Sequence, residues 1–281
     1  MDRIRLSNQM ELPQIGLGTW QITDREVMRE LLGKAYQEGY RLFDTAAAYS
    51  NEIAIGHAIR ALSLEREELF LSDKVWNTYR GYDNVRKACE KSLKKLKTDH
   101  LELYLVHWPA SPRLYPDWAA INADTWRGME SLYQEGIVKA IGVCNFKAHH
   151  LKELQKTAEI MPMVNQLEFH PGMMQEETVG FCRAEGIVVE ASSPLGNGKI
   201  LQNEQLRQIA ERTHKTAAQV CLRWALQKGV IVIPKTVNPD RLIENRDLYD
   251  FELSAPEMDM IDRIPYCGGI GIDSDEVVEF G

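Results

Sequence analysis

The chain has 281 residues, of which 44% are hydrophobic and 26% are charged, and its formal net charge is −8. This acidic balance argues against nucleic acid or an anionic membrane surface as a general partner. Residues 1–5 lack the apolar stretch of a secretory signal, and no segment approaches the ~20 apolar residues that a membrane span needs. We therefore expect a globular protein with no membrane partner, large enough to fold without disulfides or metal.

Short apolar runs alternate with amphipathic stretches along the whole chain. Extended segments at residues 3–6 and 10–12, joined by a polar turn, predict an N-terminal β-hairpin. After the first predicted barrel strand, apolar residues recur at helical spacing. A capping box of Thr23 and Glu26 predicts where this helix begins. Eight barrel strands are predicted at 15–18, 42–44, 69–74, 101–107, 140–143, 164–167, 188–191 and 230–234.

Eight strands that each precede a helix predict an α/β fold, a closed (β/α)8 TIM barrel, in preference to an open sheet. No Pro- or Ser-rich linker divides the chain, so we expect one barrel domain that covers residues 1–281. The N-terminal hairpin would then close the bottom of the barrel.

Four residues of different chemistry lie at the ends of three successive predicted strands. Asp44 and Tyr49 follow the second strand, Lys74 ends the third, and His107 ends the fourth. Because a barrel gathers the carboxyl ends of its strands at one rim, we expect these four side chains to converge there.

An acid, a phenol, an amine and an imidazole in one cleft can deliver a proton to a reacting oxygen. A Lys74 ammonium near Tyr49 would favour the phenolate and lower the pKa of the phenol from its usual ~10, which makes Tyr49 a better acid. Asp44 would keep Lys74 charged and fix its direction. His107 would be a second donor, facing the charge that develops as a carbonyl group is reduced.

Each of these residues alone has a simpler interpretation. A strand-end Asp44 or Lys74 is more often a solvated charge or part of a structural ion pair. Tyr49 near a helix start is more often a packing residue, and His107 could be a core histidine. Their joint occurrence at equivalent strand ends favours the functional interpretation.

The motifs around these four residues resemble the signatures of the aldo-keto reductase family. Residues 44–52 (DTAAAYSNE) are similar to the first signature of that family, and 74–77 (KVWN) and 105–109 (LVHWP) match the segments around its lysine and histidine. The resemblance covers residues 16–251. It is strongest to bacterial NADPH-dependent members similar to 2,5-diketogluconate reductases and prostaglandin F synthase-like proteins.

The resemblance also implies roles for the four residues. Tyr49 would be the general acid of a carbonyl reduction, Lys74 and Asp44 would tune its acidity, and His107 would position the substrate carbonyl. Proton delivery alone reduces nothing, so this chemistry requires a hydride donor.

A doubly wound nucleotide-binding domain is not expected. The dinucleotide fingerprint G-x-G-x-x-G is absent, because residues 16–21 read GLGTWQ, and residues 196–200 (GNGKI) do not form a P-loop.

The family resemblance instead places a dinucleotide on the segment after the last strand. There Lys235 and Arg241 offer charge for a 2′-phosphate, and a helix predicted to start at residues 238–240 favours an anion at its N-terminus. A basic residue before a capped helix is also common in any α/β protein, but two converging cations favour NADPH over NADH. The implied contacts are Lys235, Thr236, Val237, Asn238, Arg241, Glu244 and Asn245.

The implied contacts at the nicotinamide end are Gly18, Thr19, Trp20, Asp44, Cys144, Asn145, Gln166, Ser192, Ser193 and Leu195. Two of these depart from the family pattern. Cys144 stands where a serine is common and is a weaker donor. Ser192 stands where an aromatic residue is common and offers no ring for nicotinamide to stack on, a loss of about 1 kcal/mol.

The substrate end of the pocket should be aromatic, although a single Trp often simply packs in the core. Residues 110–122 show no helical period and would form a flap. The short tail, residues 266–281, suggests an open pocket with loose specificity. The implied substrate contacts are Trp20, Tyr49, Trp76, His107 and Trp108.

The remaining histidines and the cysteines give no sign of a metal site. His170 is interpreted as structural, and His149 and His150 as exposed helix residues. An odd number of cysteines without a C-x-x-C pair is typical of reduced thiols in a cytoplasmic protein. These cysteines are Cys89, Cys144, Cys182, Cys221 and Cys267.

The favoured hypothesis is a monomeric, cytoplasmic enzyme that uses NADPH to reduce small aldehydes or ketones to alcohols, with Tyr49 as general acid. A second hypothesis is an NADP(H)-binding redox sensor or regulatory subunit on the same fold, with slow turnover. A third is a barrel hydrolase with Asp44 and Glu168 as its acid–base pair, which leaves residues 235–245 unexplained.

Overall fold

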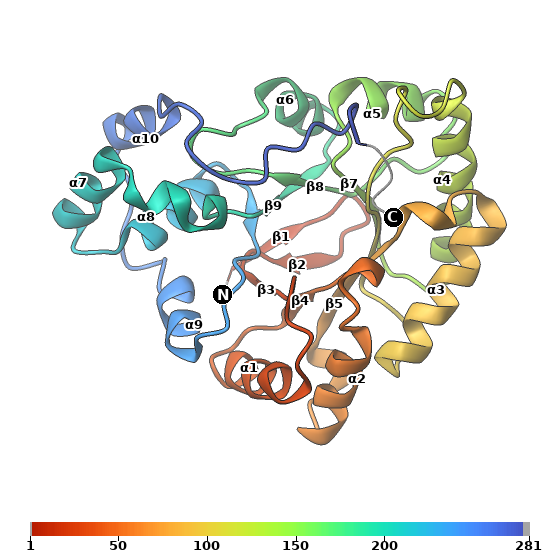
Figure 1. Cartoon of the computed structure of the whole chain (residues 1–281), viewed down its shortest axis with the longest axis horizontal. Helices are drawn as coiled ribbons and strands as arrows, with labels where there is room; N and C mark the ends of the chain where they lie inside the picture. The colour runs from red at the N-terminus through yellow and green to blue at the C-terminus, as the bar shows by residue number, and fades with distance from the viewer. Residues whose placement is uncertain (1, 278–281) are drawn as a thin grey trace.

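Eight parallel strands form the centre of the computed structural model, which describes residues 2–277 (Figure 1). The strands are hydrogen-bonded in chain order, as the sequence predicts for a (β/α)8 barrel. Parallel bridges from Ile15 to Val232 and from Gly18 to Lys235 join the last strand to the first and close the barrel. The strands are β3 (Gly16–Gly18), β4 (Leu42–Asp44), β5 (Phe70–Val75), β6 (Leu103–Val106), β7 (Ile141–Cys144), β8 (Val164–Glu168), β9 (Val188–Ser192) and β10 (Ile231–Val232).

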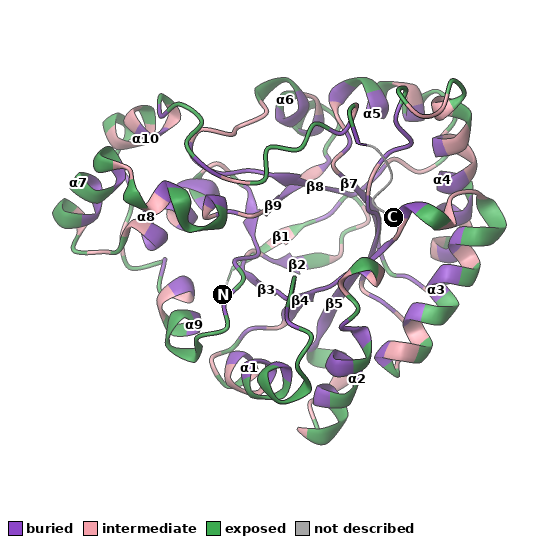
Figure 2. Ribbon diagram, in the orientation of Figure 1, coloured by how far each residue is buried: buried purple, intermediate pink, exposed green. Residues whose placement is uncertain are grey.

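Helices surround the barrel and bury one face each against it (Figure 2). In α3, for example, Val85, Ala88, Cys89, Ser92 and Leu96 are buried, a spacing of three and four residues that defines one helix face. The helices are α1 (Arg25–Gln37), α2 (Glu52–Ala61), α3 (Tyr82–Leu96), α4 (Trp118–Gln134), α5 (Ala148–Gln155), α6 (Glu176–Ala184), α7 (Glu204–Thr213), α8 (Ala217–Gln227), α9 (Pro239–Arg246) and α10 (Ala255–Asp262). Short 3₁₀ turns are η1 (Ala47–Tyr49), η2 (Arg66–Glu68), η3 (Asn77–Tyr79) and η4 (Gly196–Gln202).

The N-terminal hairpin lies across the bottom of the barrel (Figure 1). Strands β1 (Arg3–Arg5) and β2 (Glu11–Pro13) pair antiparallel, and Leu6 and Leu12 are fully buried. Asn8 in the turn donates to the carbonyl oxygen of Lys139, just before β7, at 2.9 Å. The predicted hairpin is therefore confirmed. Because it covers the amino ends of the strands, we expect a ligand at the opposite rim.

Two local predictions were wrong. The side chain of Asp24, and not a capping box of Thr23, accepts from the backbone N–H groups of Glu26 and Val27 at the start of α1. Helix α4 begins at Trp118, inside the segment predicted as a loop, so the irregular stretch ends at residue 117. The first buried residues of α4 are polar. The hydrophobic pattern of the sequence therefore does not reveal the start of this helix.

Within residues 2–277, none of the helices combines the length and the apolar character that crossing a membrane would require.

Candidate active site

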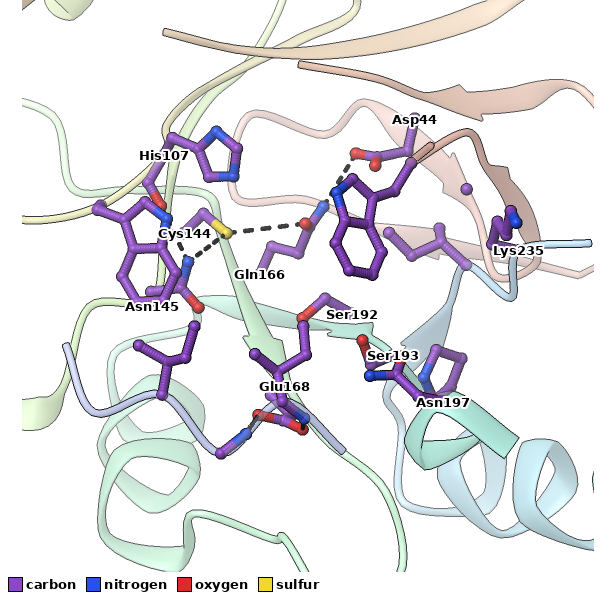
Figure 3. Close-up of a pocket in the computed structure, with 18 of the residues that line it drawn as sticks. Asp44, His107, Cys144, Asn145, Gln166, Glu168, Ser192, Ser193, Asn197 and Lys235 are labelled. Atoms are coloured by element: carbon purple, nitrogen blue, oxygen red, sulfur yellow. Dashed lines mark hydrogen bonds between the residues drawn. The ribbon is translucent and has the colours of Figure 1, made fainter. Parts of the chain in front are cut away.

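A cavity of about 1360 Å³ opens at the carboxyl ends of the barrel strands. All four residues of the predicted proton-delivery group, Asp44, Tyr49, Lys74 and His107, lie at this rim, although Lys74 is covered by the others. Figure 3 shows residues from β4, β7, β8 and β9 that point toward one another across it. The tertiary structure thus brings the four residues together as expected.

Lys74 is the centre of this group and is fully buried. Its ammonium donates to both carboxylate oxygens of Asp44 at 2.8 Å and to the carbonyl oxygen of Thr45 at 2.9 Å. The hydroxyl of Tyr49 lies 3.5 Å from the same nitrogen. Three close acceptors compensate the ammonium for lost water, so the charge can persist inside the barrel.

The pKa values in this group follow from burial and from the ion pair. Burial alone would lower the pKa of Lys74, but the Asp44 carboxylate outweighs it and the pKa is raised. Burial raises the pKa of Tyr49, and Lys74 opposes that shift without reversing it. Lys74 therefore acts on the Tyr49 pKa in the predicted direction, but burial, which the sequence alone does not reveal, is the larger effect. Tyr49 is therefore protonated at neutral pH and can donate its proton when negative charge develops on a nearby oxygen.

His107 follows β6 and packs edge-on against two aromatic rings. Its ring centroid lies 5.1 Å from that of Trp76 and 5.8 Å from that of Tyr49. Burial, together with the Lys74 charge, keeps the pKa of His107 well below its usual range. The imidazole is therefore neutral at physiological pH and has one N–H to donate.

The predicted nicotinamide contacts form a chain of side chains on one wall of the cavity (Figure 3). The amide of Asn145 donates to the carbonyl oxygen of His107 at 3.0 Å and contacts the Cys144 sulfur at 3.2 Å. That sulfur lies 3.7 Å from Oε1 of Gln166, whose Nε2 donates to Asp44 at 3.0 Å. The Gln166 amide is thus fixed by the same carboxylate that holds Lys74.

Lys235 and Arg241 also line this cavity, and Lys235 pairs with Gly18, the register partner of Asp44. Within residues 2–277 neither forms an ion pair with a carboxylate, which fits a site for an anionic ligand. The predicted helix start is confirmed, because the Asn238 side chain caps α9 by accepting from the backbone N–H of Asp240 at 2.9 Å. One cavity is therefore lined both by two cations and by the acid–phenol–amine group, as a phosphate-bearing dinucleotide requires.

Eleven of the seventeen predicted cofactor residues line this cavity, and six do not. Thr19 is buried behind it and donates to the Asp44 carbonyl oxygen at 2.8 Å. Glu244 accepts from the hydroxyl of Thr216 at 2.6 Å and so ties α9 to α8. The six are Thr19, Thr236, Val237, Asn238, Glu244 and Asn245.

The C-terminal tail was expected to leave the pocket open, but residues 270–274 line it. The carboxylate of Glu168, at the end of β8, accepts from the backbone N–H groups of Ile270 at 2.5 Å and Gly271 at 2.8 Å. A Cβ on Gly269, whose φ is +111°, would lie 2.0 Å from Oε1 of Glu168. Only glycine therefore allows the tail to run this close to the carboxylate.

A second attachment holds the tail at Asp275. Lys147 Nζ donates to Asp275 at 2.8 Å, and His149 and His150 lie 3.0 and 3.2 Å from the same carboxylate. His150 is fully buried, so its prediction as an exposed residue was wrong. His150 belongs to a stretch of α5 that is polar in sequence, and its buried ring faces Asp275.

The group of His149, His150 and Asp275 has three potential metal ligands within 4.8 Å, but its hydrogen bonds favour a tether. Nδ1 of His150 accepts from the backbone N–H of Lys147 at 3.1 Å. Its proton then resides on Nε2, which faces Asp275. A metal at Nε2 would need that position deprotonated while Nδ1 remains an acceptor, which neutral imidazole does not permit.

Comparison with known proteins connects this geometry to a family. The model of the Aldo/keto reductase family matches residues 14–265. The chain belongs to this family. It is 47% identical to glyoxal reductase of Bacillus subtilis strain 168, over 99% of this chain and 98% of that protein. It is 40% identical to methylglyoxal reductase DkgA of Escherichia coli O157:H7, over 97% of both.

Solved structures of aldo/keto reductases agree with this assignment. A variant of Gox0644 in complex with NADPH superimposes with a TM-score of 0.91 at 37% identity, covering 99% of both chains. An aldo/keto reductase from Brucella melitensis gives a TM-score of 0.86 at 39% identity, covering 93% of this chain and 98% of that one.

Proposed function

We propose that this aldo/keto reductase transfers hydride from NADPH to the carbonyl carbon of small aldehydes and ketones, giving alcohols. The observation that carries the proposal is that one cavity is lined by the cationic Lys235 and Arg241 and also by Asp44, Tyr49 and His107, which the buried Lys74 backs. The relatives named as reductases, and the neighbour described with NADPH, support it.

Bound NADPH would supply the hydride, and side chains of the protein would deliver the proton. Tyr49 gives its proton to the carbonyl oxygen as negative charge develops there. The Lys74 ammonium stabilises the phenolate that remains, and Asp44 holds that ammonium in place. The neutral His107 donates to the carbonyl oxygen and fixes its direction.

The remaining cavity residues would hold the cofactor. Asn145 and Gln166 present amides to the nicotinamide carboxamide, and Lys235 and Arg241 neutralise phosphate charge. Ser192 offers no aromatic ring on which the nicotinamide could stack. We therefore expect the protein to bind the nicotinamide end of the cofactor with modest affinity. Replacing Ser192 by Tyr should tighten NADPH binding.

For the substrate, we propose small carbonyl compounds, with α-dicarbonyls as the first class to test. Two relatives are named glyoxal reductase and methylglyoxal reductase. Trp20, Trp76 and Trp108 line the cavity and provide an apolar wall, to which the tail residues Ile270 and Ile272 add. An apolar wall favours weakly charged substrates.

The test is a steady-state assay that follows the loss of NADPH absorbance with a panel of aldehydes, ketones and dicarbonyls. Many turnovers per protein molecule are expected with at least one compound class. Oxidation of one equivalent of NADPH without further cycling would instead indicate a sensor, an interpretation that the reductase relatives do not favour.

The hydrolase hypothesis has little geometric support. Asp44 is bonded to Lys74, and Glu168 accepts from two tail amides and lies 3.2 Å from His170. Neither carboxylate is available as half of an acid–base pair for hydrolysis.

We also propose that the protein is a monomer of the cytoplasm. All five cysteines are free thiols, and four are buried, as is typical of a reducing compartment. Light scattering coupled to gel filtration should give one peak at the 32.1 kDa monomer mass. A dimer mass at micromolar concentration would overturn the monomer.

A further inference from the structure

A buried acid that has no role in the reaction proposed above lies next to the active-site residue Gln166. Glu190 on β9 points into the barrel and is fully buried. Its register partner on β8 is Gln166, and on β10 it is the apolar Ile231. Nε2 of Gln166 donates to Oε1 of Glu190 at 2.5 Å, and Oε2 of Glu190 has no partner within residues 2–277.

The hydrogen-bonding capacity of Gln166 links this acid to the active site. A carboxamide nitrogen carries two hydrogens, and in this structure one is directed to Asp44 and the other to Glu190. The amide oxygen of Gln166 is thereby turned toward Cys144 and the cavity. Asp44 in turn holds Lys74, so Glu190 is two side chains removed from the ammonium beside Tyr49.

We propose that Glu190 is a positioning residue, which in its neutral form fixes the Gln166 carboxamide and, when ionised, weakens Tyr49 as an acid. This inference rests on the reductase function proposed above. A carboxylate with an unpaired oxygen in the dry barrel interior is costly, whereas a neutral acid can accept from Gln166 and keep its proton on the unpaired oxygen. A second negative charge beside Asp44 would stabilise the Tyr49 proton and slow its transfer.

Glu190 is expected to titrate near neutral pH, whereas Lys74 and Cys144, which face it, are not. Burial, then the Asp44 charge, raises the pKa of Glu190 to about 8. The other groups that face it are Asp44 on β4, Lys74 on β5 and Cys144 on β7. The pKa values of Lys74 and Cys144 are raised, by the Asp44 charge and by burial respectively, so both stay protonated through this range.

The decisive variant is Glu190→Gln, which keeps the shape and the acceptor oxygen but cannot ionise. In the parent enzyme, kcat for a dicarbonyl should fall about tenfold from pH 7 to pH 9, as expected for one group with a pKa near 8 whose ionised form is inactive. In Glu190→Gln the fall should be less than about twofold. Glu130→Gln, at a buried glutamate on α4 outside the cavity, is the matched control and should keep the parent profile.

A readout without cofactor separates this proposal from the proposed function. Infrared or carbon NMR titration of the free protein should detect a carboxyl group that ionises near pH 8 and is missing in Glu190→Gln. If the protein reduces no carbonyl compound, this titration still decides the state of Glu190. An unchanged titration, or the same alkaline fall in kcat in both proteins, would overturn the inference.

A second variant tests the positioning role. Glu190→Leu removes the acceptor and fills the space with an apolar side chain, so the fold should be retained or stabilised. The Kd for NADPH, measured by fluorescence titration, should rise roughly threefold or more, because Gln166 loses one of its two anchors. An unchanged Kd in this folded variant would mean that Asp44 alone orients Gln166.

Discussion

Lys74 illustrates how a charge can be placed where water is excluded. The ammonium lies among the two oxygens of Asp44 and the carbonyl of Thr45, and Tyr49 completes its surroundings. Such a pair contributes little net stability over an apolar pair, yet breaking it is costly. The arrangement is therefore better explained by reactivity than by stability.

The first prediction concerns the acid. Tyr49→Phe keeps the ring beside Lys74 but removes the proton donor, so turnover should fall ~10²-fold or more while NADPH binding persists. Stopped-flow and fluorescence titration would measure the two quantities. Tyr79→Phe, on η3 outside the cavity, is the control. Turnover of Tyr49→Phe near that of the control would remove Tyr49 from the acid role.

The second prediction concerns the ion pair. Lys74→Met leaves the buried Asp44 carboxylate uncompensated and should lower the free energy of unfolding by about 3–5 kcal/mol. Adding Asp44→Asn should recover part of that loss. Urea unfolding of the single and double variants gives the comparison. A double variant no more stable than Lys74→Met would contradict the electrostatic explanation.

The third prediction concerns cofactor choice. Lys235→Ala removes one of the two cations, Lys235 and Arg241, that are proposed to bind the 2′-phosphate, so NADPH affinity should fall about tenfold and NADH affinity much less. Equal losses for the two cofactors in fluorescence titration would mean that the 2′-phosphate is bound elsewhere.

At the level of elements, the C-terminal tail is attached to the barrel at several points, two of which bracket the segment that lines the cavity. Glu168 binds the backbone at Ile270 and Gly271, and the start of α5 binds Asp275 through Lys147 and His150. Between these points the tail forms one wall of the cavity. The tail therefore helps to shape the cavity even though it has no regular secondary structure.

The fourth prediction tests the first of these attachments. Glu168→Gln leaves one good acceptor for two backbone N–H groups, so the amides of Ile270 and Gly271 should exchange with deuterium about tenfold faster. KM for a small dicarbonyl should rise. Glu177→Gln, an exposed glutamate on α6, is the control. Unchanged exchange at the two amides would show that the tail is held by other contacts.

The same attachment has a defined pH dependence. Burial alone would raise the pKa of Glu168, but hydrogen bonds from His170 and from the tail amides outweigh it and the pKa is lowered. A lowered pKa in the folded state means that the carboxylate stabilises the fold above its ordinary pKa and that this contribution is lost as the pH falls through the lowered value. The tail should remain attached throughout the neutral range.

At the scale of the whole molecule, the barrel depends on close contact between its first and last strands. Gly18 N–H donates to the carbonyl oxygen of Pro234, and a Cβ on Gly18 would lie 2.7 Å from the carbonyl oxygen of Ile233. Closure thus requires a residue without a side chain at the point where β3 meets the end of β10.

The fifth prediction follows from this closure. Gly18→Ala should lower the free energy of unfolding by about 2 kcal/mol, because backbone must move to admit the methyl group. Gly180→Ala, in α6 with open space around it, should raise the free energy of unfolding by about 0.5–1 kcal/mol. Chemical denaturation of both variants gives the test, and equal stabilities would contradict the closure argument.

The sequence by itself determined the barrel, its hairpin and the convergence of Asp44, Tyr49, Lys74 and His107. Hydrophobic periodicity is local, and the barrel brings strand ends to one rim whatever the loops do. Only the tertiary structure decided the path of the tail, the burial of His150 and the dryness that raises the pKa of Tyr49. Those features depend on contacts such as that of Glu168 with Ile270, 102 positions away, and no local pattern encodes them.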